Sequence, residues 1–572
     1  MNTLDYIILA AIAIIAIITV SIIKRRKYTK KLRQKIDMQW GKRPVENYKD
    51  EDMQAIACYF DNLREAEAGR TFLDSITWND LDMDNIFKRL NSTQSTVGEE
   101  YLYALLREPV TDGHLLNERN KLAEFFQKNP KQRIQLQFLL ARLGKERFSG
   151  ASNYFFSNAE YAPFRRYKYI FLLAIFLLSP IVMTVSISTG ILMIIASFFI
   201  NMTVYYKAKN ELSTQLDSMS YMVNLITYSR KIADHNISGL EEYSGILKKT
   251  ASKIKGTSIK SFYQIFYQTQ DPLFEYFKIV FLVELIAFES INKKIMKHRS
   301  DLRTLYETVG LLDSMVAVAS FRQSVPFYSV PELYKANQRR GPSLSFEEIY
   351  HPLIDKPVTN SVNLKKPVLI TGSNASGKST FLKTAAINSV FAQTISTCLA
   401  SRYESSYFMI YTSMALKDNL LSSESYYIAE IKSLKRILDS LNDQIPLFCV
   451  IDEVLRGTNT IERIAASSEV MRLLAGKNCI CMTATHDIEL VSILQGLFDN
   501  YHFQESFKDN NIIFDYKIYP GKSNTRNAIK LLEIMGYPEG TVKAARTTAE
   551  HFEREGSWVG APKAACNKVI VK

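Results

Sequence analysis

The chain has 572 residues, of which 47 % are hydrophobic and 23 % are charged, and its formal net charge is +13. These proportions are ordinary for a packed protein of about three to five domains, and they exclude a disordered or collagen-like chain. Six scattered cysteines are too few for a secreted disulfide framework, so reduced cytosolic thiols are the simpler interpretation. The excess of Lys and Arg suits nucleic acid or an anionic membrane surface and does not choose between them.

The first predicted element is an N-terminal transmembrane anchor within residues 1–23. Tyr6–Ile23 is an 18-residue run without a charged side chain, close to the length that spans a bilayer as a helix. Eight Lys and Arg residues follow between Lys24 and Lys35, whereas a cleaved signal peptide carries its positive charge before the apolar run. The positive-inside rule places the N-terminus outside and the bulk of the chain in the cytoplasm, as an integral protein of the cell membrane.

Residues 24–165 are predicted to form a helical cytoplasmic region. In Asn47–Ala68 and Asp112–Leu143, apolar residues recur at spacings of three and four with few helix breakers, which is typical of amphipathic helices. Residues 208–340 have a similar long, charged and helix-like texture. The sequence therefore predicts an all-α part of the chain on both sides of a second apolar segment.

That second segment, residues 166–207, is predicted to be a transmembrane helical hairpin. Tyr169–Tyr206 contains 38 residues without a charge, enough for two spans, and Ser188–Gly190 offers a turn between them. Lys and Arg residues flank both ends of the run, so both ends are expected in the cytoplasm. The alternative is a buried hairpin of a soluble core, but a soluble helix of this length normally keeps a polar face. Because many basic residues flank membrane segments, the net charge is a weak argument for DNA binding.

Beyond residue 340 the pattern of apolar and polar residues changes. In residues 341–545, short β-rich runs alternate with amphipathic stretches, which predicts an α/β domain with a mostly parallel sheet. Residues 546–572 form a C-terminal tail, which shows no clear pattern after Trp558.

The most informative motif lies in this α/β region. Gly372–Ser379 matches the phosphate-loop pattern G-x-x-x-x-G-K-[ST] and is placed between an apolar strand, Val368–Ile370, and a helical run. Backbone N–H groups of such a loop surround phosphate oxygens, and the following helix points its positive end at the anion. Lys378 is expected to reach the β- and γ-phosphates of ATP, and Ser379 to ligate Mg²⁺. The predicted nucleotide-binding residues are Gly372, Ser373, Asn374, Ala375, Ser376, Gly377, Lys378, Ser379 and Thr380. A Gly- and Ser-rich turn without a ligand is the alternative.

Two later strands end in residues that suit the same site. The apolar run 447–451 is followed by Asp452, placed to hold Mg²⁺, and by Glu453, which could polarise the attacking water. Another apolar strand, 481–485, ends at His486, where an imidazole could sense the γ-phosphate; a structural histidine is the rival interpretation. The sequence therefore predicts a P-loop ATP hydrolase that uses ATP and Mg²⁺, with Lys378, Glu453 and His486 as catalytic residues.

These motifs, in this order, resemble the ATPase domain of the MutS family of DNA mismatch-repair proteins. The family's phosphate loop reads TGPNMxGKST, where Thr371–Thr380 reads TGSNASGKST; its LLDELGRGTST corresponds to Val450–Thr460, and its THYFEL to Thr485–Leu490. Its SGxSTFMVEM corresponds to Ser422–Ile431, with serine and two tyrosines replacing its Gly and Thr-Phe. The resemblance implies an α/β P-loop NTPase domain of the ABC/MutS type and a homodimer formed through that domain.

By the same resemblance, Ser425 would contact the γ-phosphate bound to the partner subunit, and Arg456–Thr460 would lie along the shared interface. The likeness extends to the helical region. Leu90–Pro109 looks like the start of the family's core domain, Leu311–Ser320 like the end of its lever helices, and Gly521–Ala545 like the helical segment that follows its ATPase sheet.

The departures from the family shape the functional hypothesis. The mismatch-reading domain with its Phe-x-Glu wedge has no counterpart here, and the hairpin at 166–207 takes the place in chain order of the family's DNA clamp. We therefore expect lever helices that run to a lipid bilayer, in a membrane-anchored, dimeric ATPase that does not read mismatches.

Two alternatives stay open at this point. The first is a membrane-tethered DNA-binding protein, because the basic clusters Lys248–Lys260 and Lys293–Arg303 could meet DNA phosphates, although they equally suit a solvated helix face or a lipid patch. The second is an ABC-type transporter ATPase, against which three spans without pocket-forming polar residues argue. The sequence does not fix DNA binding, the pathway, the role of the hairpin, or whether the dimer is homomeric.

Overall fold

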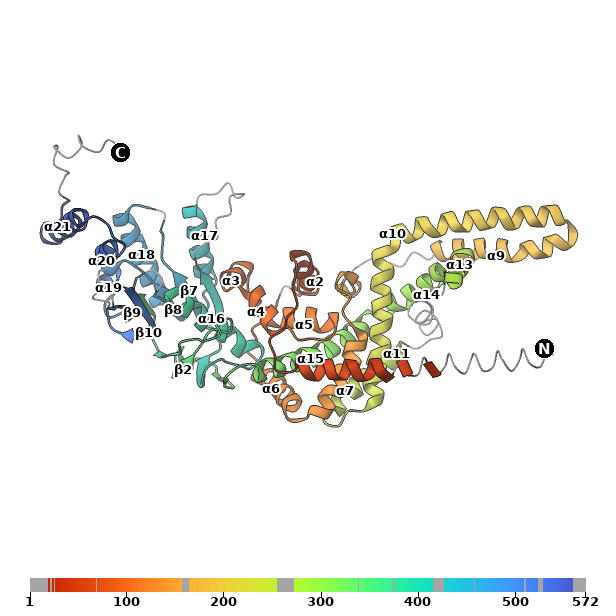
Figure 1. The fold of residues 1–572 in the computed structure, drawn as a ribbon, viewed down its shortest axis with the longest axis horizontal. Coiled ribbons are helices and arrows are strands. Elements are labelled where there is room, and N and C mark those ends of the chain that lie inside the picture. Colours follow the sequence, from red (N-terminus) through yellow and green to blue (C-terminus); the bar gives the residue numbers. More distant parts are fainter. Residues whose placement is uncertain are drawn as a thin grey trace, which may run out of the picture. The chain divides into compact units, whose positions relative to one another are not determined.

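The computed structural model describes residues 19–20, 23–24, 26–67, 69–156, 164–254, 272–337, 339–373, 376–414, 426–456, 458–508, 511–522 and 528–558 (Figure 1). The chain divides into two compact units, one formed by residues 1–331 with 388–399 and the other by residues 332–387 with 400–572. Most of the predicted N-terminal anchor, together with Asn374, Ala375, Ser425 and the end of the tail from residue 559, lies outside the described residues.

The first unit is helical. Residues 26–39 form a helix, and the further helices of the unit are α2 (Asp50–Ala66), α3 (Ser75–Asp80), α4 (Met83–Leu90), α5 (Thr96–Arg107), α6 (Gly113–Lys128), α7 (Pro130–Leu143), η1 (Arg147–Ser149), α8 (Asn153–Phe156), α9 (Phe164–Val185), α10 (Ile187–His235), α11 (Glu241–Lys253), α13 (Pro272–Phe281), α14 (Val283–Lys297) and α15 (Arg299–Gln323). The stretch predicted from Asp112 to Leu143 is divided into α6 and α7. Pro130 lacks a backbone N–H and occupies the first position of α7, where that donor would have no partner inside the helix.

Helices α5 and α15 pack closely in the core of this unit. A Cβ atom added at Gly98 of α5 would lie 2.2 Å from a carboxylate oxygen of Asp313 on α15. Asp313 is fully buried and accepts hydrogen bonds from the backbone N–H groups of Gln94 and Ser95 and from the Ser95 hydroxyl. These bonds hold the loop before α5 against α15 and offset the cost of burying a carboxyl group. The two segments that resemble the family's core and lever regions therefore lie side by side.

A second buried carboxyl group in this core makes stability depend on pH. Burial raises the pKa of Glu100 from 4.5 to about 8, although the Tyr306 hydroxyl, which donates to Glu100 Oε2 at 2.6 Å, acts in the opposite direction. Between these two values the folded chain retains a proton that the unfolded chain has lost, so the free energy of unfolding falls as pH rises through this window.

We therefore expect Glu100→Gln to remove this pH dependence. The neutral amide should raise the melting temperature by roughly 5–10 °C at pH 8.5 and change it little at pH 5, as measured by thermal unfolding in detergent. Glu51→Gln, at an exposed position of α2, is the matched control. Equal shifts of the melting temperature at both pH values would show that Glu100 is already ionised in the folded chain.

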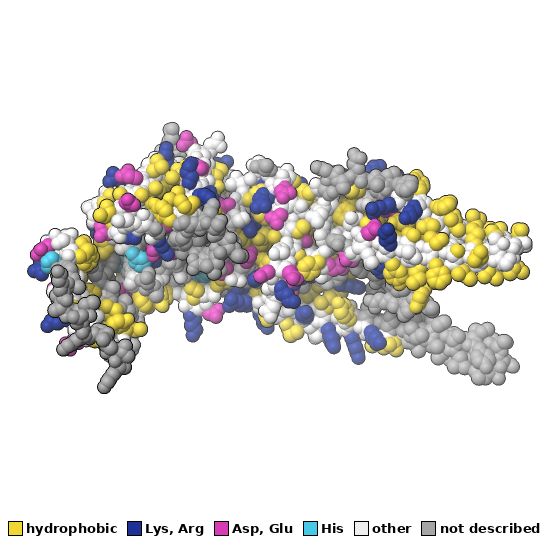
Figure 2. Space-filling view, turned by 90° about the horizontal axis from the view of Figure 1, so that it is seen from above, with side chains coloured by type: hydrophobic (Ala, Val, Ile, Leu, Met, Phe, Trp, Pro, Cys, Tyr) yellow, Lys and Arg dark blue, Asp and Glu magenta, His cyan; other side chains and the backbone are white. Residues whose placement is uncertain are grey.

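Helices α9 and α10 form a long apolar hairpin. Two segments, Arg165–Val185 and Ile187–Ser213, are long and apolar enough to cross a membrane, and only 11 % and 17 % of their most apolar windows are buried. Figure 2 shows hydrophobic side chains covering this end of the unit, with Lys and Arg side chains at its base. A helix in a soluble core would be mostly buried, so this exposure favours a membrane over the soluble-core alternative. Helix α10 continues to His235, so one helix of 49 residues joins the hairpin to the helical core.

The turn of the hairpin lies at Ser186, and its prediction at Ser188–Gly190 was wrong. Ser186 has extended backbone angles, with φ −148° and ψ 110°, and α10 begins at the next residue. Gly190 lies in the first turns of α10, where an added Cβ atom would come within 2.2 Å of Met183 on α9. Glycine is therefore needed at this position for the close approach of the two helices, and the turn itself does not use it.

The second unit contains two β-sheets. The larger has the strand order β10-β9-β4-β8-β7-β6, and all of its neighbouring strands are parallel except β9 and β10. The smaller has the order β1-β5-β2-β3. Their strands are β1 (Glu332–Tyr334), β2 (Leu344–Ile349), β3 (Asn360–Leu364), β4 (Val368–Thr371), β5 (Arg402–Ser406), β6 (Met409–Ser413), β7 (Leu447–Asp452), β8 (Cys479–Ala484), β9 (Asp499–Lys508) and β10 (Asn511–Pro520).

Helices cover both faces of the larger sheet. The helices of this unit are α16 (Lys378–Thr394), whose last residues from 388 on belong to the first unit, α17 (Tyr426–Asp439), α18 (Thr460–Ala475), α19 (Ile488–Ile493), α20 (Ala528–Ile534) and α21 (Glu539–Glu555). Apolar side chains of α17, α18 and α19 form one buried cluster with β7 and β8. Helix α16 lies between the two sheets, since the ring of Phe381 is 5.8 Å from that of Phe503 on β9 and 6.1 Å from that of Phe346 on β2. This packing fixes the start of α16 at the carboxyl end of β4.

Candidate nucleotide-binding site

The phosphate-loop pattern connects β4 to α16. Gly372 and Gly377 have φ angles of 147° and 103°, and a Cβ atom at Gly372 would lie 2.9 Å from the carbonyl oxygen of Phe503. Side chains are poorly tolerated at both positions, so the path of the loop requires the two glycines. Lys378 opens α16, and its Nζ atom donates hydrogen bonds to the carbonyl oxygens of Gly372 and Ser373 at 2.7 and 2.8 Å. The loop and the lysine therefore form one hydrogen-bonded unit.

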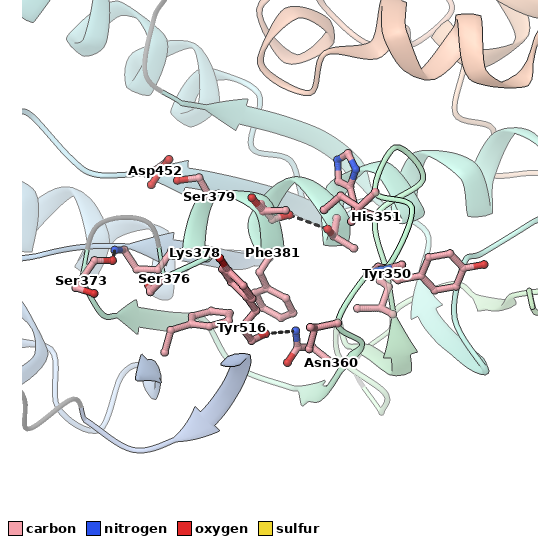
Figure 3. Close-up of a pocket in the computed structure, with 18 of the residues that line it drawn as sticks. Tyr350, His351, Asn360, Ser373, Ser376, Lys378, Ser379, Phe381, Asp452 and Tyr516 are labelled. Carbon is pink, nitrogen blue, oxygen red and sulfur yellow. Dashed lines mark hydrogen bonds between the residues drawn. The ribbon is translucent and has the colours of Figure 1, made fainter. Parts of the chain in front are cut away.

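A cavity of about 390 Å³ lies beside this loop (Figure 3). The structure brings nine of the residues predicted from the sequence to its wall: Ser373, Ser376, Gly377, Lys378, Ser379, Thr380, Asp452, Glu453 and His486. Gly372 lies at the start of the loop, and its carbonyl oxygen accepts a hydrogen bond from Lys378 Nζ. The residues come from the carboxyl ends of β4, β7 and β8, which meet at one edge because the strands are parallel.

Glu453 is the centre of a charged cluster on this wall. Its Oε1 atom lies 3.0 Å from Nε2 of His486, and its Oε2 atom lies 2.6 Å from Nε of Arg456. The same His486 Nε2 atom lies 3.4 Å from Nζ of Lys378. Burial raises the pKa of Glu453, but the hydrogen bond with His486 and the charge of Arg456 outweigh burial, so the net pKa is lowered. The carboxylate is therefore ionised at neutral pH and oriented by both neighbours.

The backbone after β7 is strained where it carries these residues. Glu453 and Leu455 have positive φ angles of 61° and 58°, which are uncommon for residues with side chains. The carboxyl group of Glu430 on α17 accepts hydrogen bonds from the backbone N–H groups of Leu455 and Arg456, while burial raises the pKa of Glu430. Strain of this kind persists when the surroundings impose it, and it is frequent at functional sites.

The donor atoms of the cavity fit a phosphate group and a magnesium ion. Ser376 is 1 % exposed, and among the described residues its hydroxyl has no hydrogen-bond partner although it lines the cavity. A buried hydroxyl of this kind is suited to a phosphate oxygen. Ser379 and Asp452 are drawn close together in Figure 3, and they offer one hydroxyl and one carboxylate oxygen. Mg²⁺ commonly takes one or two such protein ligands beside phosphate oxygens and water.

Sequence patterns alone missed the residues at the other end of the cavity. Ile349, Tyr350 and Tyr516 give this end an apolar and aromatic wall. Tyr516 has φ 55° and lies in an irregularity of the β9–β10 ladder, and its carbonyl oxygen accepts a hydrogen bond from the Asn360 side chain at 3.0 Å. Nothing in the sequence of β10 signals this irregularity.

The sheet order, the loop geometry and the clustered polar residues define a P-loop nucleotide-binding domain of the α/β class. Residues 368–553 match the protein family MutS domain V. The chain is 26 % identical over 278 residues to the DNA mismatch repair protein MutS of Thermus thermophilus, which covers 47 % of this chain and 33 % of the relative. It is 27 % identical over 305 residues to the human MutS protein homolog 4, which covers 50 % of this chain and 31 % of the relative.

A third relative, the DNA mismatch repair protein MutS of Thermotoga maritima, is 26 % identical over 278 residues, or 46 % of this chain and 33 % of the relative. The chain therefore spans about a third of the length of these curated relatives. The predicted resemblance to the MutS family is therefore confirmed, and residues 368–553 are the part of the chain that matches the family model.

Proposed function

We propose that the chain is a membrane-anchored MutS-type ATPase that hydrolyses ATP with Mg²⁺ and dimerises through its nucleotide-binding domain. The observation that carries this proposal is the convergence of Lys378, Asp452, Glu453 and His486 on one cavity beside the phosphate loop. The match to MutS domain V favours this class over an ABC-type transporter. The direct test is the rate of phosphate release by the full chain in detergent, with magnesium present or chelated. A rate that magnesium does not change would contradict the proposal.

Each residue has a role that follows from its place in the cavity. Lys378 and the loop N–H groups bind the phosphates, and Tyr516, which lines the other end of the cavity, suits the flat face of a nucleobase. Ser379 and Asp452 would hold Mg²⁺, which supplies charge neutralisation on the phosphate oxygens when it is bound. Glu453 takes the proton of the attacking water, and the oxygen of that water forms a bond to the γ-phosphorus as the bond to the ADP oxygen breaks.

Exposed apolar residues near the cavity support the dimer. Ile461 at the start of α18 is 78 % exposed, and Ile428 on α17 is 43 % exposed. Ile461 directly follows Arg456–Thr460, which the family resemblance places along the interface, and Ile428 lies three residues beyond Ser425. Apolar side chains at such positions are suited to burial against a second copy of the chain. Ser425, proposed to contact the partner subunit's nucleotide, lies outside the described residues.

The membrane part of the proposal rests on the hairpin of α9 and α10. Its apolar faces are exposed, and a bilayer would cover them without leaving the backbone of either helix unpaired. We expect the chain to stay in the membrane fraction after washes with high salt and with alkaline carbonate, as followed by immunoblotting. Its release by either wash would contradict integral insertion of the hairpin.

DNA binding is the second candidate function, because relatives of this chain carry the name DNA mismatch repair protein. The basic clusters Lys248–Lys260 and Lys293–Arg303 are partly neutralised, since Lys253 of α11 pairs with Asp301 at 2.7 Å. Residues 255–260 of the first cluster lie outside the described residues. We expect no measurable retention of duplex DNA in a filter-binding assay at about 150 mM salt. Measurable affinity with a steep dependence on salt would favour the DNA-binding alternative instead.

A further inference from the structure

The phosphate loop is tied to β9 through a residue at which this chain departs from the family pattern. The Oγ atom of Ser373 donates a hydrogen bond to Oε2 of Glu505 at 2.5 Å, a length typical of a bond to an ionised acceptor. The MutS-like motif has proline at the position of Ser373, and proline has no hydroxyl to donate. The bond therefore depends on the residue that this chain has in place of proline.

The backbone of Ser373 in turn holds Lys378. The Ser373 carbonyl oxygen accepts a hydrogen bond from Lys378 Nζ at 2.8 Å and one from the backbone N–H of Ser376 at 3.4 Å. Figure 3 shows Ser373 and Ser376 together in the loop. A displacement of the Ser373 peptide would therefore move the ammonium group that is placed to bind phosphate.

Strand β9 gives Glu505 a fixed position beside the loop. Thr371 of β4 pairs with His502 of β9 in parallel register, and the entry of the loop at Gly372 passes close to the backbone of Phe503. Glu505 is two residues beyond Phe503 and so projects from the same face of the strand. Glu505 itself pairs with Phe514 of β10, beyond the point where the pairing of β9 with β4 ends at His502.

We propose that Glu505 is a positioning residue for nucleotide binding. Through Ser373 it fixes the loop carbonyl that orients Lys378, and it replaces the rigidity of the proline ring with a hydrogen bond. This role rests on the proposed ATPase function. Because the Glu505 carboxylate also repels phosphate, the test compares variants that keep its negative charge.

Ser373→Ala and Glu505→Asp both keep the charge and break the bond, the second because its side chain is one methylene shorter. In steady-state ATPase assays of the full chain in detergent, we expect each to raise the KM for Mg·ATP about fivefold to tenfold and to leave kcat within about twofold, since the contact acts equally on bound substrate and transition state. The double variant should raise KM no further than either single variant, because both remove the same bond.

Two rescue variants separate positioning from general structural support. Ser373→Thr retains the hydroxyl and Ser373→Pro restores the rigid loop residue of the family pattern, so both are expected to keep KM close to that of the wild type. Ser492→Ala, at an exposed position of α19, is the matched control. Since Ser373→Pro also lacks the hydroxyl, its rescue shows that the hydroxyl acts by holding the loop and not by contacting the nucleotide.

The results of these assays distinguish failure of the role proposed for Glu505 from failure of the proposed ATPase function. If the wild type hydrolyses ATP, three results would overturn the role of Glu505 alone. These are an unchanged KM in Ser373→Ala, additive effects on KM in the double variant, and no rescue of KM by Ser373→Pro. A wild type that hydrolyses no ATP overturns the proposed function, and with it the role assigned to Glu505.

Discussion

Lys378→Ala is expected to reduce ATP hydrolysis at least about 100-fold, the size of effect seen when a charged or hydrogen-bonding group is removed from a developing negative charge. In the structure, the Nζ atom of Lys378 is held over the loop by the carbonyl oxygens of Gly372 and Ser373. Alanine removes the charge and leaves those carbonyls without their donor. The measurement is the initial rate of phosphate release at saturating Mg·ATP.

Lys366→Ala is the matched control for this variant. Lys366 is exposed and precedes β4, so it lies at the opposite end of that strand from the loop. The Lys366→Ala variant should hydrolyse ATP at the rate of the wild type. If Lys378→Ala were also active at that rate, the cavity beside the phosphate loop would not be the catalytic site.

Glu453→Gln is expected to keep ATP binding while kcat falls about 100-fold to 10,000-fold, the range for loss of a general base. Glutamine preserves the size of the side chain and its contact with His486, but an amide cannot take the proton of the attacking water. Because bound ATP would persist, the variant should accumulate as a dimer. The measurements are ATP binding at equilibrium, turnover, and crosslinking with and without ATP.

Glu469→Gln is the control for Glu453→Gln, because Glu469 is a surface glutamate of α18 with a 71 % exposed side chain. It should leave both turnover and the fraction of dimer unchanged. Normal turnover in Glu453→Gln would contradict the role of Glu453 as general base. Slow turnover without an increase in crosslinked dimer would contradict the nucleotide-dependent dimer and leave the catalytic role intact.

Local patterns in the sequence were sufficient to predict the strands and the loop of the nucleotide site. The apolar runs at 447–451 and 481–485 form β7 and β8, which are buried along their whole length. Asp452 is the last residue of β7 and His486 lies two residues beyond the end of β8, so parallel pairing brings both to the edge where Lys378 lies. Chain order and a parallel sheet were enough to predict that these residues share one site, because each lies at or just beyond the carboxyl end of its own strand.

The shape of the helical hairpin shows where local patterns fail. The 38-residue apolar run predicts two spans, and α9 and α10 have the length and composition of such spans. The sequence predicts the turn at Ser188–Gly190, because glycine commonly marks turns. In the structure, Gly190 instead allows α10 to approach Met183, a requirement that arises only when two helices pack together.

The sequence by itself determined the resemblance to the MutS family, the phosphate loop and the acidic residue pair at the end of β7, because each is encoded in a short contiguous run. Only the tertiary structure placed Tyr516 with Asn360, 156 residues away, and Ser373 with Glu505, 132 residues away. Contacts of this kind depend on strand order, on a bulge and on the packing of β9 and β10 against the loop. Those features result from the packing of the whole unit, so no single segment of the sequence specifies them.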